Sequence, residues 1–276
     1  MEILWIVIPL LAVIVIYLFL IFPALRRHPD RKILNGMYIA HRGLHSLKPN
    51  TPENSLAAFR EAVEHNIAIE IDIHITADNE VVVFHDDNLK RMCSLNRVIE
   101  TMTLAEIKKL RLSDTDEKIP TLKETLMLVD GRVPLMIEFK TISLETCSRL
   151  CKKANEILKD YKGKYFIQSF FPFVLYWYRK NRKDIIRGQL SSWYGRGEAL
   201  KMKLLGKLVF NFIARPDFIS YEYMFKNKFG RRLCVFLGAY SVGWVFKSQR
   251  EVNKYADAYP TRIFENFLPC DNKTEK

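Results

Sequence analysis

Three acidic side chains and a lysine lie at the ends of two apolar runs in the sequence. In the run IAIEIDIHI, the two-residue period of a strand places Glu70 and Asp72 on one face. Glu138 and Lys140 share a face in the same way at the end of the apolar run 133–139. Carboxylates this close repel each other and resist burial unless a hard divalent cation neutralises them. An isolated Glu-x-Asp pair is more often a solvated strand face, but three acids at strand ends favour a metal site.

Two histidines occupy equivalent places, each directly after an apolar run. His41 follows residues 36–40, and His85, with Asp86 beside it, follows residues 81–84. Either histidine alone is more often structural than catalytic. Because imidazole titrates near neutral pH, two such groups can serve as general acid and general base on opposite sides of a phosphorus atom.

The residues around His41 suggest what such a pair would act on. The planar guanidinium of Arg42 and the ammonium of Lys140 can bind phosphate oxygens, and a divalent cation would neutralise the same charge. We expect Gly43 to let the backbone pass close to the ligand and Glu53 to hold the Arg42 guanidinium in place. The chemistry predicted is cleavage of a phosphodiester.

The elements that must position these side chains alternate between strand-like and helix-like runs. Candidate strands cover 36–40, 67–73, 81–84, 133–139, 165–168, 184–189, 217–220, 242–246 and 261–264. Candidate helices include 55–65, 104–110, 144–158 and 174–180. This alternation predicts an α/β fold, and a barrel is its most economical closed form. Barrels carry their chemistry at the carboxyl ends of the strands, where the polar residues above lie.

The charge of the chain is strongly positive and concentrated in one stretch. The 276 residues carry a formal net charge of +12, and residues 176–232 contain fourteen Lys or Arg against four acids. Within it, leucines and a phenylalanine at 200–212 are spaced for a helical stripe flanked by lysines. That stripe fits either a barrel helix with a solvated face or an interfacial helix on an anionic leaflet. No nucleic-acid-binding motif accompanies the charge, so nucleic acid is disfavoured as a partner.

The N-terminal residues 1–25 form an apolar run. Its uncharged part is about 34 Å long as a helix, which predicts a transmembrane anchor across a core of ~30 Å. Glu2 precedes the run and no convincing cleavage site follows, so we expect the anchor to be retained. The basic juxtamembrane linker 26–35 predicts a single-pass protein of the cell membrane with a barrel domain, 36–270, on the cytoplasmic side. Its basic residues are Arg26, Arg27, Arg31 and Lys32.

Five motifs, in order and in register, resemble the glycerophosphodiester phosphodiesterase family. They are His41-Arg42-Gly43, Pro52-Glu53-Asn54-Ser55, Glu70-Ile71-Asp72, His85-Asp86 and Glu138-Phe139-Lys140. The segments IPTLKETL and IQSF resemble two further parts of the family pattern. The resemblance therefore covers residues 37–267 and leaves out the apolar N-terminal run; the chain resembles a membrane-anchored bacterial-type member.

The resemblance implies a TIM-type (β/α)8 barrel that hydrolyses a glycerophosphodiester to glycerol 3-phosphate and an alcohol. It implies a divalent ion, Mg²⁺ or Ca²⁺, at Glu70, Asp72 and Glu138, with His41 and His85 as the acid/base pair. Supporting positions are then Gly43, Glu53, Asn54 and Asp86.

The last third of the chain follows the pattern more loosely. Trp244 is placed for a substrate wall, but Glu265 and Asn266 stand where the common form has Thr-Asp. That departure leaves the choice of substrate open.

Several alternatives stay open. The substrate could be a lysophospholipid and membrane lipids could be partners, while nothing indicates an obligate protein partner. A neighbouring substrate hydroxyl could attack the phosphorus and release a cyclic phosphate, as in related phospholipases. A catalytically inactive barrel that binds a lipid headgroup is the non-enzymatic alternative.

Overall fold

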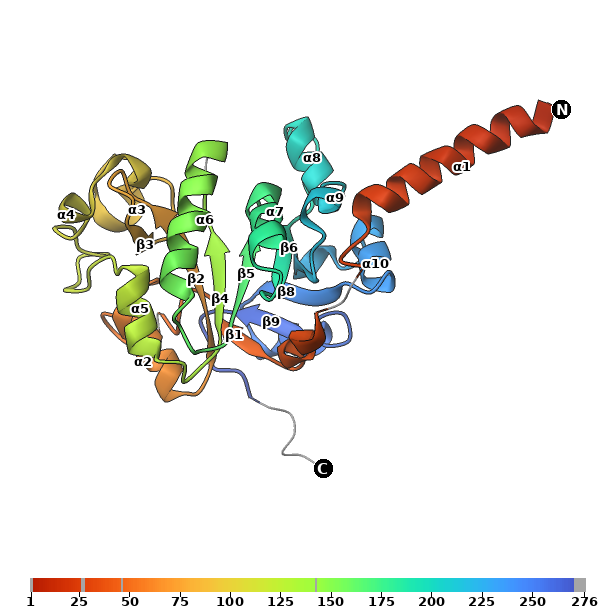
Figure 1. The fold of residues 1–276 in the computed structure, drawn as a ribbon. Helices are drawn as coiled ribbons and strands as arrows, with labels where there is room; N and C mark the ends of the chain where they lie inside the picture. The colour runs from red at the N-terminus through yellow and green to blue at the C-terminus, as the bar shows by residue number, and fades with distance from the viewer. Residues whose placement is uncertain (1, 26–27, 46, 142, 271–276) are drawn as a thin grey trace.

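The computed structural model describes residues 2–25, 28–45, 47–141 and 143–270, which form a closed parallel barrel (Figure 1). The first strand pairs with both the second and the last, which closes the sheet. The barrel strands are β1 (Tyr38–Ala40), β2 (Ala68–Ile75), β4 (Leu135–Phe139), β5 (Tyr165–Ser169), β6 (Arg187–Ser191), β7 (Phe218–Glu222), β8 (Tyr240–Phe246) and β9 (Thr261–Phe264). The predicted (β/α)8 barrel is therefore confirmed.

Helices surround the strands, as Figure 1 shows. They are α2 (Leu56–Glu64), α5 (Leu122–Val129), α6 (Leu144–Leu158), α7 (Pro172–Asn181), α8 (Leu200–Gly206), α9 (Asn211–Ala214), α10 (Phe229–Phe236) and α11 (Gln249–Lys254), with a 3-10 turn η3 (Tyr223–Phe225). Their starts follow local chemistry: Ser55 and Thr121 accept hydrogen bonds from backbone N–H groups of the first turns of α2 and α5. These caps fix where the connecting loops end, and the loops carry the polar residues.

One excursion lies outside the barrel. Strand β3 (Val81–Val83) pairs antiparallel with β2, and α3 (Lys90–Cys93), η2 (Ile99–Thr101) and α4 (Leu104–Ile107) follow it. These elements bury a small core of their own, which includes Phe84 and Leu89. All nine predicted strands are thus present, but β3 serves to carry His85 to the barrel mouth instead of joining the barrel.

The end of the barrel where the strands begin is closed by a 3-10 turn, η1 (Pro29–Leu34). Leu34 is fully buried and packs with Ile39, Phe218 and Ile263 inside the barrel. Leu34 of the predicted linker 26–35 therefore belongs to the barrel core, where its apolar side chain acts as a plug. Arg26 and Arg27 of the predicted basic cluster lie outside the described residues.

The predicted transmembrane anchor is not supported. Within the part of the chain that the structure describes, no helix is long and apolar enough to cross a membrane. The first helix, α1 (Glu2–Ile21), has described side chains only from Trp5 onward. The predicted run to residue 25 is also interrupted, because Ile21 is buried on the barrel and its carbonyl accepts a hydrogen bond from Asn211 Nδ2 at 3.0 Å.

The stretch 200–212 is not one helical stripe. The left-handed φ of Leu208, 62°, ends helical geometry between α8 and α9. Leu205 and Leu208 are buried, whereas Leu200 is 71% exposed. The predicted continuous apolar face is therefore split over two short helices that cover the barrel between β6 and β7.

Candidate active site

The three predicted carboxylates meet at the mouth of the barrel. Strands β2 and β4 are neighbours, and their register places Asp72 directly beside Glu138. Glu70, Asp72 and Glu138 each offer an oxygen within 4.8 Å of the others, and all three residues are at most 5% exposed. The fold thus concentrates three acidic groups at positions that are almost fully buried.

Burial and mutual repulsion perturb these acids strongly. Burial, followed by repulsion from Asp72 and Glu138, raises the pKa of Glu70 well above its ordinary value. Burial also raises the pKa of Glu138, against the attraction of Lys140. Burial opposes ionisation of Asp72 as well, but the positive charges led by Lys140 outweigh it and hold the pKa of Asp72 below its usual range. When all three carboxylates are ionised, their negative charge exceeds the positive charge of the groups around them.

The donor set fits a hard divalent cation. Asp72 Oδ1 and Glu138 Oε1 are buried and accept no hydrogen bond of good geometry. Lys140 Nζ lies 2.6 Å from Glu138 Oε1 and 3.3 Å from Asp72 Oδ1, so attraction to this ammonium partly compensates both oxygens. Carboxylate oxygens are the ligands that Mg²⁺ and Ca²⁺ prefer, and both ions suit this set. Glu70, Asp72 and Glu138 are therefore the residues that would hold the metal.

The loop after β1 supports this cluster from one side. Arg42 donates its backbone N–H to Glu70 Oε2 at 3.1 Å and its Nη1 to Glu53 Oε1 at 2.8 Å. Asn54 Nδ2 donates to Asp72 Oδ2 at 2.9 Å. Arg42 and Asn54 both adopt left-handed φ angles, 56° and 54°, and a backbone hydrogen bond joins them. The Pro-Glu-Asn segment thus holds an arginine and a carboxylate in place.

The structure gives a packing reason for Gly43, which is independent of the predicted approach of a ligand. It has a φ of +85°, and a Cβ there would lie 2.9 Å from the carbonyl carbon and Cβ of Ala58 in α2. Gly43 does not line the cavity at the barrel mouth. The left-handed turn and the close packing on α2 each require a glycine here.

Replacing Gly43 by Ala is therefore expected to lower the free energy of unfolding by about 1–3 kcal/mol, because the turn becomes strained and α2 must shift. Urea unfolding measures this change. Gly197 also has a positive φ, but a Cβ added there would meet no atom within 4 Å, so Gly197→Ala is the matched control. An equal loss in both variants would show that the contact with Ala58 contributes nothing.

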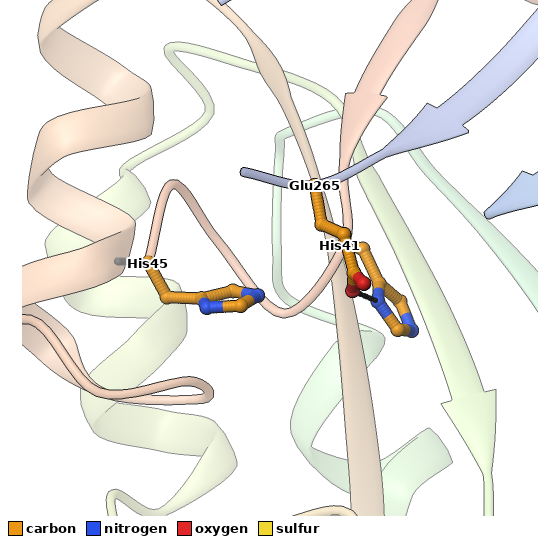
Figure 2. Close-up of side chains that lie close together, drawn as sticks. All are labelled: His41, His45 and Glu265. Atoms are coloured by element: carbon orange, nitrogen blue, oxygen red, sulfur yellow. Dashed lines mark hydrogen bonds and ion pairs between the residues drawn. The ribbon is translucent and has the colours of Figure 1, made fainter. Parts of the chain in front are cut away.

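His41 is oriented by Glu265, a carboxylate that the sequence marks only as a departure from the family pattern. Figure 2 shows the His41 ring beside Glu265, which follows β9, and Nδ1 of His41 lies 2.7 Å from Glu265 Oε2. The hydrogen bond with His41 lowers the pKa of Glu265 to about 2, so this carboxylate is an acceptor at neutral pH. Nδ1 then carries the proton, which leaves the lone pair of a neutral His41 ring on Nε2. Burial lowers the pKa of His41, and Glu265 partly opposes that effect.

His85 is oriented in the same manner. Its Nδ1 lies 2.6 Å from Asp86 Oδ1, and Arg91 Nε donates to Asp86 Oδ2 at 2.7 Å. Arg91 also donates to Glu53 at 2.6 Å, so one arginine joins the carboxylates that hold His85 and Arg42. Burial lowers the pKa of His85. Both histidines therefore have Nδ1 bound to a carboxylate.

The side chains face one cavity of about 680 Å³. Its lining includes His41, Arg42, Glu70, His85, Glu138, Lys140, Trp244 and Glu265. Trp244 forms part of the wall, with its ring edge-on to Phe170 at 5.9 Å between centroids. Asp72 lies against the base of the same site through its ion pair with Lys140. The structure thus brings together the predicted acid/base, metal and phosphate-binding residues.

Sequence reasoning missed several members of the site. Glu265, Lys247 and His45 line the same cavity, and Lys247 Nζ lies 3.2 Å from Glu265 Oε1. His45 lies across from the His41–Glu265 pair in Figure 2, and the three offer ligand atoms within 4.8 Å of one another. The signal for Glu265 was its place directly after a strand, the same place that marked His41 and His85.

Replacing Glu265 by Gln is expected to lower kcat by about tenfold, because the His41 ring loses its charged acceptor. Since Glu265 raises the pKa of His41, its loss should move that pKa, and the matching limb of the pH–rate profile, to lower pH. Titration of the His41 ring by NMR in metal-free protein checks the shift. The exposed Glu64 provides the control Glu64→Gln; an unchanged His41 titration in Glu265→Gln would contradict the orienting role.

Comparison with known proteins gives three consistent findings. The model of the glycerophosphoryl diester phosphodiesterase family matches residues 41–194. A glycerophosphodiester phosphodiesterase of Caldanaerobacter subterraneus is 37% identical over 152 residues, which are 51% of this chain and 61% of that protein. Human lysophospholipase D GDPD1 is 32% identical over 162 residues, 54% of this chain and 49% of that protein. The chain thus spans about half the length of the curated relatives it matches.

Solved structures agree on the fold. A phosphodiesterase of Oleispira antarctica, solved with its product sn-glycerol-3-phosphate, superposes with a TM-score of 0.70 at 22% identity, over 84% of this chain and 94% of that one. The family match covers the loop of His41 and Arg42, the carboxylates of β2 and β4, and His85. The chain belongs to the glycerophosphoryl diester phosphodiesterase family.

Proposed function

We propose that the protein is a phosphoric diester hydrolase that converts glycerophosphodiesters, with a divalent cation, into glycerol 3-phosphate and an alcohol. The observation that carries the proposal is the arrangement of His41 and His85, each with Nδ1 on a carboxylate, around three buried acids in one cavity. The name of the Caldanaerobacter subterraneus relative, a glycerophosphodiester phosphodiesterase, supports the same reaction.

The chain's own residues account for each part of the reaction. A cation held by Glu70, Asp72 and Glu138 supplies charge neutralisation at the phosphate. Arg42 and Lys140 bind the remaining phosphate oxygens, and Glu53 keeps the Arg42 guanidinium in place through its 2.8 Å hydrogen bond.

The two histidines move the protons. Nε2 of one histidine takes a proton from water as the water oxygen bonds to phosphorus. Nε2 of the other gives a proton to the departing alkoxide as its P–O bond breaks. Burial lowers the pKa of both rings, which favours the neutral form that a base needs. Negative charge opposes this shift at each ring, chiefly from Glu265 at His41 and from Asp72 at His85.

Product analysis with several headgroups tests the proposal. Purified full-length protein is incubated with glycerophosphocholine, glycerophosphoethanolamine, glycerophosphoglycerol and a lysophosphatidylcholine, each with EDTA, Mg²⁺ or Ca²⁺. We expect cation-dependent release of glycerol 3-phosphate or its acylated form. A cyclic phosphate would show attack by a substrate hydroxyl, and binding of headgroups with no turnover would show a binding module; either result would overturn direct hydrolysis.

Membrane lipids are the proposed surroundings of the enzyme. The described part of α1 exposes apolar residues, with Trp5 80%, Ile6 73% and Val13 63% exposed. Helix α8, which precedes the helix α9 that contacts α1, carries Lys201 and Lys203. Apolar surface beside positive charge is typical of contact with an anionic leaflet. Flotation with anionic vesicles at low salt tests this location. Failure to float would contradict it. The cytoplasmic side stays a prediction from the basic cluster 26–35.

A further inference from the structure

A second cavity, of about 700 Å³, opens beside the catalytic one, and its chemistry is different. Hydrocarbon side chains dominate its lining, and we call the part they form the apolar groove. These residues are Phe171, Phe173, Met202, Leu205, Phe210 and Ile213. They come from α7, from α8 and from the segment around α9, the elements at one side of the barrel mouth (Figure 1).

The apolar groove is continuous with the proposed reaction centre. His85, Glu138, Lys140 and Phe170 line both cavities. One end of the groove therefore lies at a proposed metal ligand and a proposed acid/base group. A molecule whose phosphodiester lies at these residues can extend into the groove without leaving the protein.

The groove is too apolar for the polar parts of a small glycerophosphodiester. Glycerol, choline and ethanolamine groups would find few polar partners among these phenylalanine, methionine and leucine side chains. A hydrocarbon chain gains free energy in proportion to the apolar area that it and the groove remove from water. The volume also falls in the range of cavities that bind small molecules.

The groove adjoins the exposed helix at the N-terminus. Phe212 of α9 packs its ring against Phe19 of α1, with centroids 6.3 Å apart, and Arg215 donates hydrogen bonds to the carbonyls of Phe19 and Phe22. On either side of Phe212 in the chain, Phe210 and Ile213 line the groove. The α9 segment thus lies between the groove and α1, whose described side chains are apolar and exposed.

We infer that the apolar groove holds the hydrocarbon chain of a single-chain phospholipid while its phosphodiester lies among His41, His85 and the carboxylates. This inference rests on the proposed hydrolase function. The water oxygen bonds to phosphorus, the P–O bond to the headgroup alcohol breaks, and that alcohol takes the proton. The acylated glycerol phosphate is the second product, and its chain remains in the groove until release.

Chain-length dependence tests the inference in the full-length protein. The value of kcat/KM is compared for glycerophosphocholine and for 1-acyl lysophosphatidylcholines of increasing chain length, each below its critical micelle concentration. We expect kcat/KM to rise by up to about fourfold for each methylene buried, until the groove is filled. A kcat/KM that does not rise with chain length would overturn the groove assignment while leaving hydrolysis of glycerophosphocholine intact.

Variants with an added negative charge test whether the hydrocarbon chain lies in the apolar groove. Phe173, 40% exposed, and Met202, partly exposed, are each replaced by Glu, which places a charge in the groove. The matched controls are Phe236→Glu and Met127→Glu, at side chains that are 85% and 80% exposed and outside the groove. We expect the groove variants to lose tenfold or more in kcat/KM for the long-chain substrate and to retain the wild-type kcat/KM for glycerophosphocholine. Both control variants should retain the wild-type kcat/KM for both substrates. Equal losses for both substrates would overturn the inference.

A binding measurement separates failure of the groove from failure of the proposed function. If the wild type hydrolyses none of these substrates, the proposed function is wrong, and chain binding is then measured by displacement of a fluorescent fatty acid with lysophosphatidylcholine. Weaker binding in Phe173→Glu than in Phe236→Glu would still support a chain site. Equal binding in the two variants would overturn it.

Discussion

Replacing Glu70 by Gln is expected to reduce cation-dependent turnover by about 10³-fold, while the metal-free protein becomes more stable. The amide keeps the size of the side chain and can still accept the Arg42 N–H, but it removes one of three anionic ligands. Charge neutralisation by a bound cation contributes several kcal/mol to such a reaction, which sets the size of the loss.

The gain in stability follows from the raised pKa of Glu70. Because burial raises this pKa above the value in the unfolded chain, ionisation costs the metal-free protein stability as the pH rises beyond the unfolded value toward the folded one. Gln does not ionise, so the variant avoids that cost at neutral pH. Thermal unfolding with EDTA, and again with Mg²⁺ or Ca²⁺, measures both effects. We expect the variant to have a higher Tm than the wild type in EDTA and a smaller rise in Tm when metal is added.

The matched control is Glu61→Gln, since Glu61 is buried in α2 and pairs with Lys48 outside the site. It should keep its activity and its response to metal. Full activity in Glu70→Gln, or a metal-induced rise in Tm equal to that of the wild type, would contradict the ligand role.

Replacing His41 or His85 by Ala is expected to lower kcat by about 10²- to 10⁴-fold each, since each removes one proton transfer in the transition state. The two roles can be separated by the leaving group. An aryl ester of glycerol phosphate with a nitrophenol leaving group needs no protonation, so it should restore much of the rate in the variant that lacks the acid. The variant that lacks the base should remain slow with both substrates.

His65→Ala serves as the control, because His65 ends α2 away from the cavity and should be dispensable. Near-normal kinetics in either His41→Ala or His85→Ala would remove that residue from the acid/base pair. Equal rescue of both variants by the aryl ester would contradict the division into acid and base.

The sequence predicts the barrel well because its signal is local. Most barrel strands are short runs rich in apolar residues, and residues such as Ile69, Ile71 and Ile73 face the helices while alternate positions face inward. A polar residue at the end of such a run stands out, which is how His41, Asp72 and Glu138 were found. The two-residue period of a strand and the position of a polar residue at its end suffice to identify these site residues, because all barrel strands end at the same mouth.

Other features depend on contacts that no local pattern records. The break between α8 and α9 comes from the left-handed Leu208, an unusual conformation for leucine that helical spacing does not reveal. The need for glycine at position 43 comes from close packing against Ala58 in the following helix. The plug formed by Leu34 needs the assembled strands before it has a cavity to fill.

The partners of the histidines show the same limit. Glu265 lies 224 positions after His41 in the chain, and only closure of the barrel by β9 against β1 brings them together. Arg91 links Glu53 to Asp86 across the excursion around β3. The apolar groove likewise arises from helices that follow different strands, so its lining has no motif in the sequence.

The most direct test of the central claim is the turnover of glycerophosphocholine in oxygen-18-labelled water, with and without EDTA, followed by mass analysis of the products. Cation-dependent hydrolysis by attack of water predicts glycerol 3-phosphate that carries one labelled oxygen on phosphorus, unlabelled choline, and no product in EDTA. Label in choline, a cyclic phosphate as the final product, or equal turnover in EDTA would contradict the account.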